Sequence, residues 1–509
     1  MRYRKPLLPI AYIIRDMAIG CKGANDFPKG VIFLDLLRSS STGLYIDGEW
    51  QQGDKSLEVY NKYSGHLIRA VAQATLENVD SAVEAATRAF RNPLPAHRRA
   101  TILRRTADLV RDHEEVFART IAQEGGKPYK DALAEVRRAI ETIQLSSEEA
   151  KRIHGETVPL DAAPGSENRM GLFLRVPKGV IAAIAPFNFP INLVVHKVGP
   201  AIAAGCPVVL KPATTTPLTS ILLAEVLEEA GLPPGYFNLI IGPGGAIGDY
   251  LVQHPGIKMV TFTGSPPVGE HIRSIAGLKE VVLELGNNSG NIVHSDADYK
   301  TAAKLLAAKA YGSAGQFCIS VQRIYVHRPI LEAFSQAFLE ESAKLKVGDP
   351  LDPSTDVGPL ITEGEAKRVK DWVDEAVSQG ATLLAGGNRE GSVIMPTALT
   401  NVTQDMKVVA QEIFGPVASL IAYDDFDEAL ELINHGTYGL QAGVFTNDIG
   451  RAWKAAKTIE AGGVIINDTS SYRVDLMPYG GTRRSGIGRE GPRFAVEEMT
   501  EIRMIVFNL

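Results

Sequence analysis

The chain has 509 residues, 45% of them hydrophobic and 22% charged, which are ordinary values for a globular protein long enough to form two or three domains. Its net charge of -6 gives no sign of a nucleic-acid partner, and no apolar run approaches the roughly 20 residues that span a bilayer. Three cysteines without a CxxC pair argue against a disulfide framework or a cysteine metal site and favour a reducing, cytoplasmic setting.

Residues 1–41 differ in composition from the rest of the chain. A basic start precedes about eight apolar residues and mimics a signal peptide, but Arg15 and Asp16 end the apolar run early. We expect a loosely packed N-terminal extension, or upstream sequence included by a wrong choice of start, rather than a targeting peptide.

From Tyr45 onward, helical and extended patterns follow each other. An extended segment with a turn at 45–50 precedes a helix that we expect to begin after Asn78, a good N-cap. A second helix is predicted after Pro95, and a third over about 129–153.

The middle of the chain changes to the alternating rhythm of a parallel, doubly wound sheet, so the predicted fold class is α/β. A strand at 172–176 should form a hairpin with the stretch near Val158. The strands and helices predicted after it are strands 180–184, 207–210, 239–241 and 259–262, with helices at 193–205, at 218–230 and between the last two strands.

A second alternating block runs from about 291 to 475, with helices near 299–310, 330–345 and 364–380. The chain ends in a strand at 501–507 that has no following partner. Such a strand often pairs with another sheet, including one in a neighbouring subunit.

Polar residues stand where predicted strands end, the edge at which a doubly wound sheet binds ligands. Asn188 lies between two prolines, and its amide suits stabilisation of an oxyanion, although a simple turn asparagine fits the same pattern. Lys211 is placed to bind hydroxyls or phosphate, and Gly264-Ser265 offers backbone N–H groups to a phosphate. Glu284 ends an apolar strand, where partial burial should raise its pKa and make it a better base.

Residues 242–248 form a glycine-rich run that resembles a dinucleotide fingerprint. The last glycine comes one residue late, and no acidic residue lies about 20 positions further on. We interpret the run as a strand-to-helix turn.

Cys318 lies in a loop of small residues and hydroxyls, 312–320, ahead of a strand-like run. The glycines allow the backbone to approach whatever the thiol attacks. The pattern fits a covalent nucleophile, and it also fits a small buried hydrophobe, the usual role of a free cysteine.

Taken together, these motifs resemble the aldehyde dehydrogenase superfamily from about Tyr45 to the C-terminus. The resemblance rests on their order along the chain: Asn188, Lys211, Gly264-Ser265, Glu284, Cys318, Glu412 and a glycine-rich C-terminal segment. It implies oxidation of an aldehyde with NAD(P) and no metal.

The resemblance assigns roles to three residues in the reaction. Cys318 matches the nucleophile, Glu284 the general base and Asn188 the oxyanion-hole amide. A thiolate would add to the aldehyde carbon, the adduct would give hydride to a nicotinamide, and water activated by Glu284 would release the thioester.

The resemblance also implies contacts to ligands. Residues expected to contact the cofactor are Pro186, Phe187, Lys211, Thr214, Gly264, Ser265, Glu412 and Phe414. Residues expected to contact the substrate are Phe189, Phe317, Tyr472 and Arg473, and Lys197 and Glu490 match positions associated with proton relay.

The chain departs from the family pattern at several positions. Thr214 replaces an acidic residue that accepts the 2′-hydroxyl of NAD, so we expect NADP to be accepted with some preference over NAD. Phe317 replaces an arginine associated with phosphate-bearing substrates, and Asn287 replaces a glycine beside Glu284.

The C-terminal loop resembles that of lactaldehyde dehydrogenases, which implies a small polar or anionic aldehyde such as lactaldehyde or glyceraldehyde 3-phosphate. Arg473 would contact the anion. A surface ion pair between Arg473 and Asp475 is the alternative.

The expected organisation follows from the same resemblance. It places an NAD(P)-binding domain at 42–157 and 178–286, a catalytic domain at 287–484, and an oligomerisation arm with the C-terminal segment at 158–177 and 485–509, in a homodimer or homotetramer. A CoA-acylating aldehyde dehydrogenase, a cysteine hydrolase and a nucleotide-binding regulator without catalysis remain as alternatives.

Overall fold

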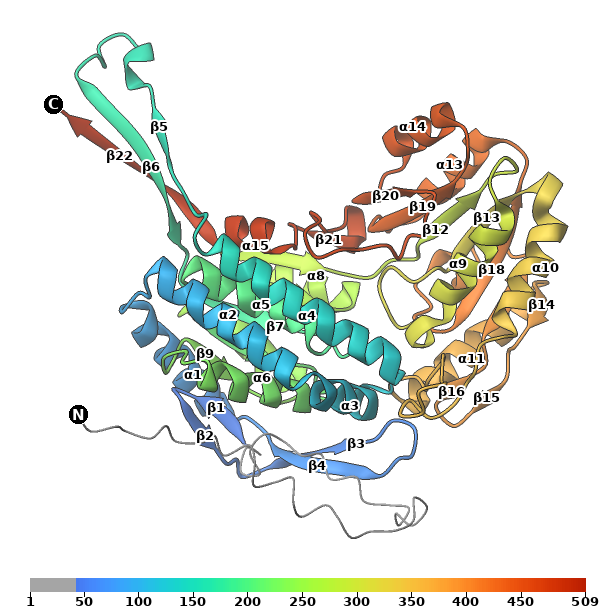
Figure 1. Ribbon diagram of the computed structural model, residues 1–509, viewed down its shortest axis with the longest axis horizontal. Helices are drawn as coiled ribbons and strands as arrows, with labels where there is room; N and C mark the ends of the chain where they lie inside the picture. The colour runs from blue at the N-terminus through green and yellow to red at the C-terminus, as the bar shows by residue number, and fades with distance from the viewer. Residues whose placement is uncertain (1–42) are drawn as a thin grey trace, which may run out of the picture. The chain divides into compact units, whose positions relative to one another are not determined.

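The computed structural model describes residues 43–509, so the expectations for residues 1–41 lie outside the described part of the chain. The described residues form helices around two large, mostly parallel sheets, with smaller antiparallel sheets beside them (Figure 1). The predicted α/β fold class is confirmed. Within this part of the chain, no helix has the length and apolar character needed to cross a membrane.

The first large sheet has eight strands in the order β2-β1-β9-β8-β7-β10-β11-β21. The five central strands, β9, β8, β7, β10 and β11, run parallel to one another. Strands β1 and β21 pair antiparallel with the two ends of this group. The bounds are β1 (Leu44–Ile46), β2 (Glu49–Gln51), β7 (Val180–Ile184), β8 (Val208–Lys211), β9 (Phe237–Leu239), β10 (Ile257–Thr263), β11 (Glu280–Glu284) and β21 (Gly486–Ile487). Strand β7 is buried along its whole length, as a strand covered on both faces should be.

Helices α5 and α6 pack on this sheet, and α2 and α4 lie over them (Figure 1). Helices α1 and α7 contact the same sheet and each other. The bounds are α1 (Leu76–Phe90), α2 (Ala96–Asp112), α3 (Glu114–Gly125), α4 (Tyr129–Glu149), α5 (Asn192–Ala204), α6 (Leu218–Glu229), α7 (Asp249–Gln253) and α8 (Pro266–Ile275).

The N-terminal helices correct two predictions and add one helix. The N-cap of α1 is Thr75 rather than Asn78; its hydroxyl accepts from the Asn78 N–H, while the Asn78 side chain accepts from the Thr75 N–H, which forms a capping box. Helix α3 was not predicted. Helix α4 ends at Glu149, four residues before the predicted end at 153, because the chain turns there.

The second large sheet has seven strands in the order β14-β17-β18-β13-β12-β19-β20. Adjacent residues Ile324 and Tyr325 belong to separate core clusters, so both faces of the sheet are covered. The strands are β12 (Gly290–Val293), β13 (Arg323–His327), β14 (Thr382–Ala385), β17 (Thr397–Thr400), β18 (Val417–Tyr423), β19 (Gln441–Phe445) and β20 (Gly463–Ile466); the helices are α9 (Tyr299–Tyr311), α10 (Leu331–Ser342), α11 (Glu363–Ser378), α12 (Lys407–Ala410), α13 (Phe426–Asn434) and α14 (Ile449–Thr458).

An antiparallel sheet of three strands contains the C-terminal strand (Figure 1). The predicted hairpin between the strand at 172–176 and the stretch near Val158 is confirmed, and the terminal strand pairs with its longer member. Its strands are β5 (Glu156–Val158), β6 (Arg169–Pro177) and β22 (Thr500–Asn508); the remaining elements are α15 (Pro492–Glu498) and the hairpins β3 (Ser56–Tyr60)–β4 (Leu67–Ala72) and β15 (Arg389–Glu390)–β16 (Val393–Ile394).

One long loop joins the two large sheets. Residues 467–485 leave β20 of the seven-stranded sheet and return to β21 of the eight-stranded sheet. The ends of β8, β10 and β11, the Cys318 loop and this connection supply the side chains of the candidate site.

Candidate active site

Cys318 follows a tightly turned segment at the end of α9. Ser313 and Ala314 adopt left-handed backbone, with φ of 47° and 54°, and so does Gly315. A side chain at Gly315 could not fit, because its Cβ would lie 2.1 Å from the Gly415 carbonyl oxygen. This close backbone contact fixes the loop that carries the thiol.

The Cys318 side chain forms part of the wall of two cavities. The first has a volume of about 720 Å³ and the second about 250 Å³. Leu193 of α5 is the other residue that both cavities share. The thiol therefore lies where the two cavities meet.

The first cavity collects most of the residues predicted to contact a cofactor. Thr214, half-buried, is not among its lining residues. The predicted cofactor contacts that do line it are Pro186, Phe187, Lys211, Gly264, Ser265, Glu412 and Phe414, and Asn188, predicted for the oxyanion hole, lines it as well.

The glycine-rich run at 242–248 lines the same cavity through Gly244, Gly245 and Gly248. The sequence pattern predicted only a turn between strand and helix. A side chain at Gly244 or Gly245 would meet no protein atom within 4 Å. The missed signal was the placement of these glycines in the segment that follows strand β9, at the edge where a doubly wound sheet binds ligands.

Burial shifts two of the charged groups that line the first cavity toward their neutral forms. It lowers the pKa of Lys211 to about 8 and raises the pKa of Glu412 to about 8. The Lys211 ammonium contacts the Pro212 carbonyl oxygen at 3.1 Å, and the Glu412 carboxylate accepts from the Asn287 N–H at 2.9 Å. Buried polar groups normally have hydrogen-bond partners. Because Lys211 and Glu412 have so few, they favour a polar ligand between them.

Asn188 connects the strand-end loop after β7 to the cysteine loop. Its Nδ2 donates to the Gln316 carbonyl oxygen at 2.9 Å. Its buried Oδ1 has no hydrogen-bond partner within residues 43–509. An amide nitrogen has two hydrogens, so one donor is left for a ligand.

Glu284 ends strand β11 in a fully buried position, and neither of its carboxylate oxygens has a partner among the described residues. Burial, followed by the charge of Glu490, raises its pKa well above the usual range. The backbone packs tightly over it, since a Cβ added to Gly480 would lie 2.9 Å from Glu284 Oε1. Glu284 lines neither cavity, and Asn287 beside it does not adopt left-handed backbone.

The second cavity holds three of the four residues predicted to contact a substrate. Phe189, Phe317 and Arg473 line it, whereas Tyr472 is 47% exposed and does not. Lys309 and Tyr479 line it as well and were not predicted. Tyr479 could have been found from its place two residues before Gly481 in the glycine-rich segment.

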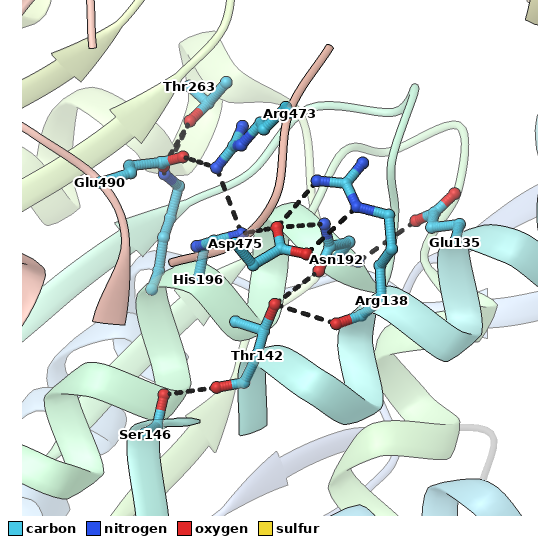
Figure 2. A network of polar contacts seen from close by, with 11 residues as sticks. Glu135, Arg138, Thr142, Ser146, Asn192, His196, Thr263, Arg473, Asp475 and Glu490 are labelled. Atoms are coloured by element: carbon cyan, nitrogen blue, oxygen red, sulfur yellow. Dashed lines mark hydrogen bonds and ion pairs between the residues drawn. The ribbon is translucent and has the colours of Figure 1, made fainter. Parts of the chain in front are cut away.

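Asp475 fixes the long loop to helices α4 and α5 (Figure 2). Arg138 donates two hydrogen bonds to it, at 2.7 and 3.1 Å, and His196 Nε2 lies 2.8 Å away. Burial alone would raise the pKa of Asp475, but His196 and Arg138 outweigh it and hold the pKa well below its usual range. The loop is thus anchored by an ionised, buried carboxylate.

Arg473 does not pair with Asp475 at the surface, so that alternative is wrong. Its side chain is 6% exposed, lies 3.3 Å from Glu490 Oε2 and contacts His196 at 3.2 Å (Figure 2). Lys197 donates to Glu490 at 2.9 Å and to Thr263 at 2.6 Å. The structure therefore brings the two predicted relay residues, Lys197 and Glu490, together beside Arg473.

The pKa values of Glu490 and Glu284 shift in opposite directions although the two carboxylates are neighbours. Burial opposes ionisation of Glu490, but Lys197, His196 and Arg473 lower its pKa to about 2. Glu284 lacks such hydrogen bonds, and burial shifts its pKa in the opposite direction, upward. Within residues 43–509, no group of three or more His, Cys, Asp or Glu side chains is arranged to hold a metal ion.

Comparison with known proteins gives consistent matches over nearly the whole described chain. A model of the "Aldehyde dehydrogenase family" matches residues 50–505. A 3-sulfolactaldehyde dehydrogenase of Priestia megaterium is 53% identical over 474 residues, which cover 93% of this chain and 99% of that protein. A lactaldehyde dehydrogenase of Methanococcus maripaludis is 40% identical over 471 residues, covering 91% and 100%.

Solved structures agree with these matches. Aldehyde dehydrogenase 21 from Physcomitrella patens, in complex with the reaction product succinate, is 40% identical with a TM-score of 0.89 and covers 91% of this chain and 98% of that one. The glyceraldehyde-3-phosphate dehydrogenase GapN from Methanocaldococcus jannaschii, complexed with NADP, is 38% identical with a TM-score of 0.86, covering 90% and 100%.

The anchoring of the loop by Asp475 predicts a large loss of stability in Asp475→Asn. Removing a buried carboxylate that is held by Arg138 and His196 should lower the free energy of unfolding by on the order of 3 kcal/mol at neutral pH. Because the folded-state pKa of Asp475 is lowered, this contribution is present above pH about 4 and disappears as the pH falls further. Urea unfolding at several pH values measures it.

Asp424→Asn is the matched control. Asp424 accepts two hydrogen bonds from Arg328, as Asp475 does from Arg138, but both side chains are more than half exposed. Its loss should change the stability by no more than about 1 kcal/mol. Equal effects of the two substitutions would contradict the special role of Asp475.

Proposed function

Since the chain belongs to the aldehyde dehydrogenase family, we propose that it oxidises a small polar or anionic aldehyde to the carboxylic acid with NAD(P), through a thioester on Cys318. The observation that carries this proposal is the position of the Cys318 thiol between two cavities, a large one and a small one. Membership of the family sets aside a cysteine hydrolase and a non-catalytic regulator. A CoA-acylating enzyme remains the alternative.

The large cavity has the size and the polar groups that a dinucleotide requires. Lys211 and Glu412, both short of partners, would bind ribose hydroxyls. Ser265 is the N-cap of α8, and the positive end of the helix dipole favours a phosphate there, although Pro266 and Pro267 in its first turn carry no N–H. When bound, the nicotinamide supplies the acceptor for the hydride.

In the first half of the reaction, the Cys318 sulfur forms a bond to the aldehyde carbon and the carbonyl oxygen becomes negative. The free N–H of the Asn188 amide and the Cys318 backbone N–H would stabilise this oxyanion. The Asn188 hydrogen bond to the Gln316 carbonyl supports this role, because it holds the amide next to the cysteine loop.

In the second half, water must attack the thioester carbon, and Glu284 would take the proton. A raised pKa suits a general base that works near neutral pH. The buried carboxylate has no hydrogen-bond partner among the described residues, so both of its oxygens could accept from a water molecule that enters beside it.

The proposed substrate class rests on the small cavity and on the relatives. The aldehydes named for the relatives, 3-sulfolactaldehyde, lactaldehyde and glyceraldehyde 3-phosphate, are short and hydroxylated, and two carry an anion. Lys309 and Arg473 bring positive charge to a cavity of about 250 Å³. The buried Nε of Arg473 has no hydrogen-bond partner within the described residues, which leaves a donor for a sulfonate or phosphate.

We also propose that copies associate through the three-stranded sheet, as a homodimer or homotetramer. Leu174, Met504 and Val506 on this sheet are each more than two fifths exposed. The eight-stranded sheet with its helices would form the cofactor-binding domain and the seven-stranded sheet the catalytic domain.

Glu284→Gln should stop the reaction at the thioester. We expect steady-state turnover to fall by about 10²–10⁴-fold, while the first turnover still yields one NAD(P)H per active site. Rapid-mixing absorbance at 340 nm measures both. Glu280→Gln, at the other end of β11, is the control and should retain turnover. If CoA restored turnover in Glu284→Gln and took the acyl group in the wild type, the CoA-acylating alternative would replace the proposal.

Thr214 predicts that NADP is accepted, with kcat/KM at least equal to that for NAD. A carboxylate at this position would repel a 2′-phosphate, so Thr214→Glu should lower kcat/KM for NADP about tenfold or more and spare NAD. Thr215→Glu, also half-buried, is the control. A large preference of the wild type for NAD over NADP would contradict this part of the proposal.

Arg473→Gln should raise KM for 3-sulfolactaldehyde and glyceraldehyde 3-phosphate about tenfold more than KM for lactaldehyde, because it removes a charged hydrogen-bond donor from the small cavity. Steady-state kinetics with the three aldehydes measures the difference. Arg493→Gln on α15, whose exposed side chain pairs with Glu497, should change none of the values. Equal KM changes for anionic and neutral aldehydes would rule out an anion contact.

A further inference from the structure

The Cys318 sulfur has a hydrogen-bond partner that the family resemblance did not suggest. The Tyr479 hydroxyl lies 3.0 Å from Sγ, and either atom can donate while the sulfur is a thiol. Once the sulfur is a thiolate, only the hydroxyl carries a proton for this bond. Tyr479 is 3% exposed, so water does not compete freely for the contact.

Arg473 lies over the ring of this tyrosine. Its guanidinium carbon is 3.6 Å from the ring centroid, and Glu490 and His196 hold the guanidinium in place. A cation over an aromatic ring is attracted to the ring's electrons and draws them away from the hydroxyl. The arrangement makes the Tyr479 hydroxyl a stronger hydrogen-bond donor.

Cys318 is partly buried, and burial disfavours the charged thiolate, so a hydrogen-bond donor to the sulfur would favour that form. Burial raises the pKa of the Cys318 thiol to about 12, and the hydrogen bond from Tyr479, followed by the charge of Arg473, opposes that rise. A thiolate is the reactive form of cysteine. Burial likewise raises the pKa of Tyr479 well above its usual range, so the hydroxyl keeps its proton.

We propose that Tyr479 is a catalytic residue whose hydroxyl donates a hydrogen bond to the Cys318 thiolate until the sulfur bonds to the aldehyde carbon. The inference rests on the proposed role of Cys318 as nucleophile. When the carbon–sulfur bond forms, the electron pair of the carbonyl bond moves to oxygen, the sulfur loses its charge, and Tyr479 remains protonated. Arg473 acts through the tyrosine as a positioning residue.

Packing alone is the competing explanation for this tyrosine. Tyr479 forms a small apolar cluster with Ile319 and Leu440, against which Phe317 and Cys318 pack. Tyr479→Phe keeps the ring in this cluster and under Arg473, and it removes only the hydroxyl. The substitution therefore separates a hydrogen bond from packing.

The test measures the alkylation of Cys318 by iodoacetamide as a function of pH in the full-length enzyme, without aldehyde or cofactor, with mass spectrometry to follow the Cys318 peptide. In Tyr479→Phe, the midpoint of the profile should rise by about one pH unit, which slows alkylation about tenfold below the midpoint. Tyr472→Phe, in the same loop but 47% exposed, should leave the profile unchanged.

A second variant tests the opposite direction. Incorporation of 3-fluorotyrosine at position 479 makes the phenol a stronger donor at nearly the same volume, so the midpoint should fall. An unchanged midpoint in both variants, with thermal unfolding like that of the wild type, would overturn the inference. Aldehyde oxidation by Cys318→Ser would instead overturn the proposed function, and the alkylation profile is measured independently of that activity.

Discussion

The buried carboxylate of Asp475 is the interaction on which the site depends. The loop 467–485 belongs to neither large sheet, and its position is set where Asp475 meets Arg138 of α4 and His196 of α5. The same loop places Arg473 and Tyr479 in the small cavity and the Gly480 backbone against Glu284. An ionised group in a dry location tolerates little displacement, because each lost hydrogen bond leaves a charge without compensation.

Scarcity of partners is the common property of the polar groups around the thiol. The pKa of Lys211 is lowered and that of Glu412 is raised, so both shifts favour the neutral form, and burial is the leading cause in both. The Glu284 carboxylate has no hydrogen bond among the described residues, while neighbouring Glu490 is held by Lys197 and Arg473. The fold thus satisfies the charged groups that hold the long loop and leaves Lys211, Glu412 and the Glu284 carboxylate with few or no partners.

The sequence predicted the features that follow local rules and missed those that depend on distant contacts. Strand ends after apolar runs located Lys211 and Glu284 because a strand's last residue meets the ligand edge wherever the sheet lies. The contacts of Asp475 could not be found this way, since Arg138 lies 337 residues away in sequence and His196 lies 279 away. Proximity in sequence also suggested an ion pair that the structure lacks. Arg473 and Asp475 are two residues apart, yet Arg473 pairs with Glu490 and Asp475 pairs with Arg138.

A thiol that belongs to the walls of two cavities is open to solutes from two directions. A bound dinucleotide covers one approach, but a small oxidant such as hydrogen peroxide still has the other until an aldehyde occupies it. Cys206, which is fully buried and hydrogen-bonded to the Met499 carbonyl, has no such exposure. If Cys318 is the nucleophile that we propose, oxidative damage to the described cysteines falls on it and is greatest when substrate is scarce, a price that comes with placing one sulfur between two cavities.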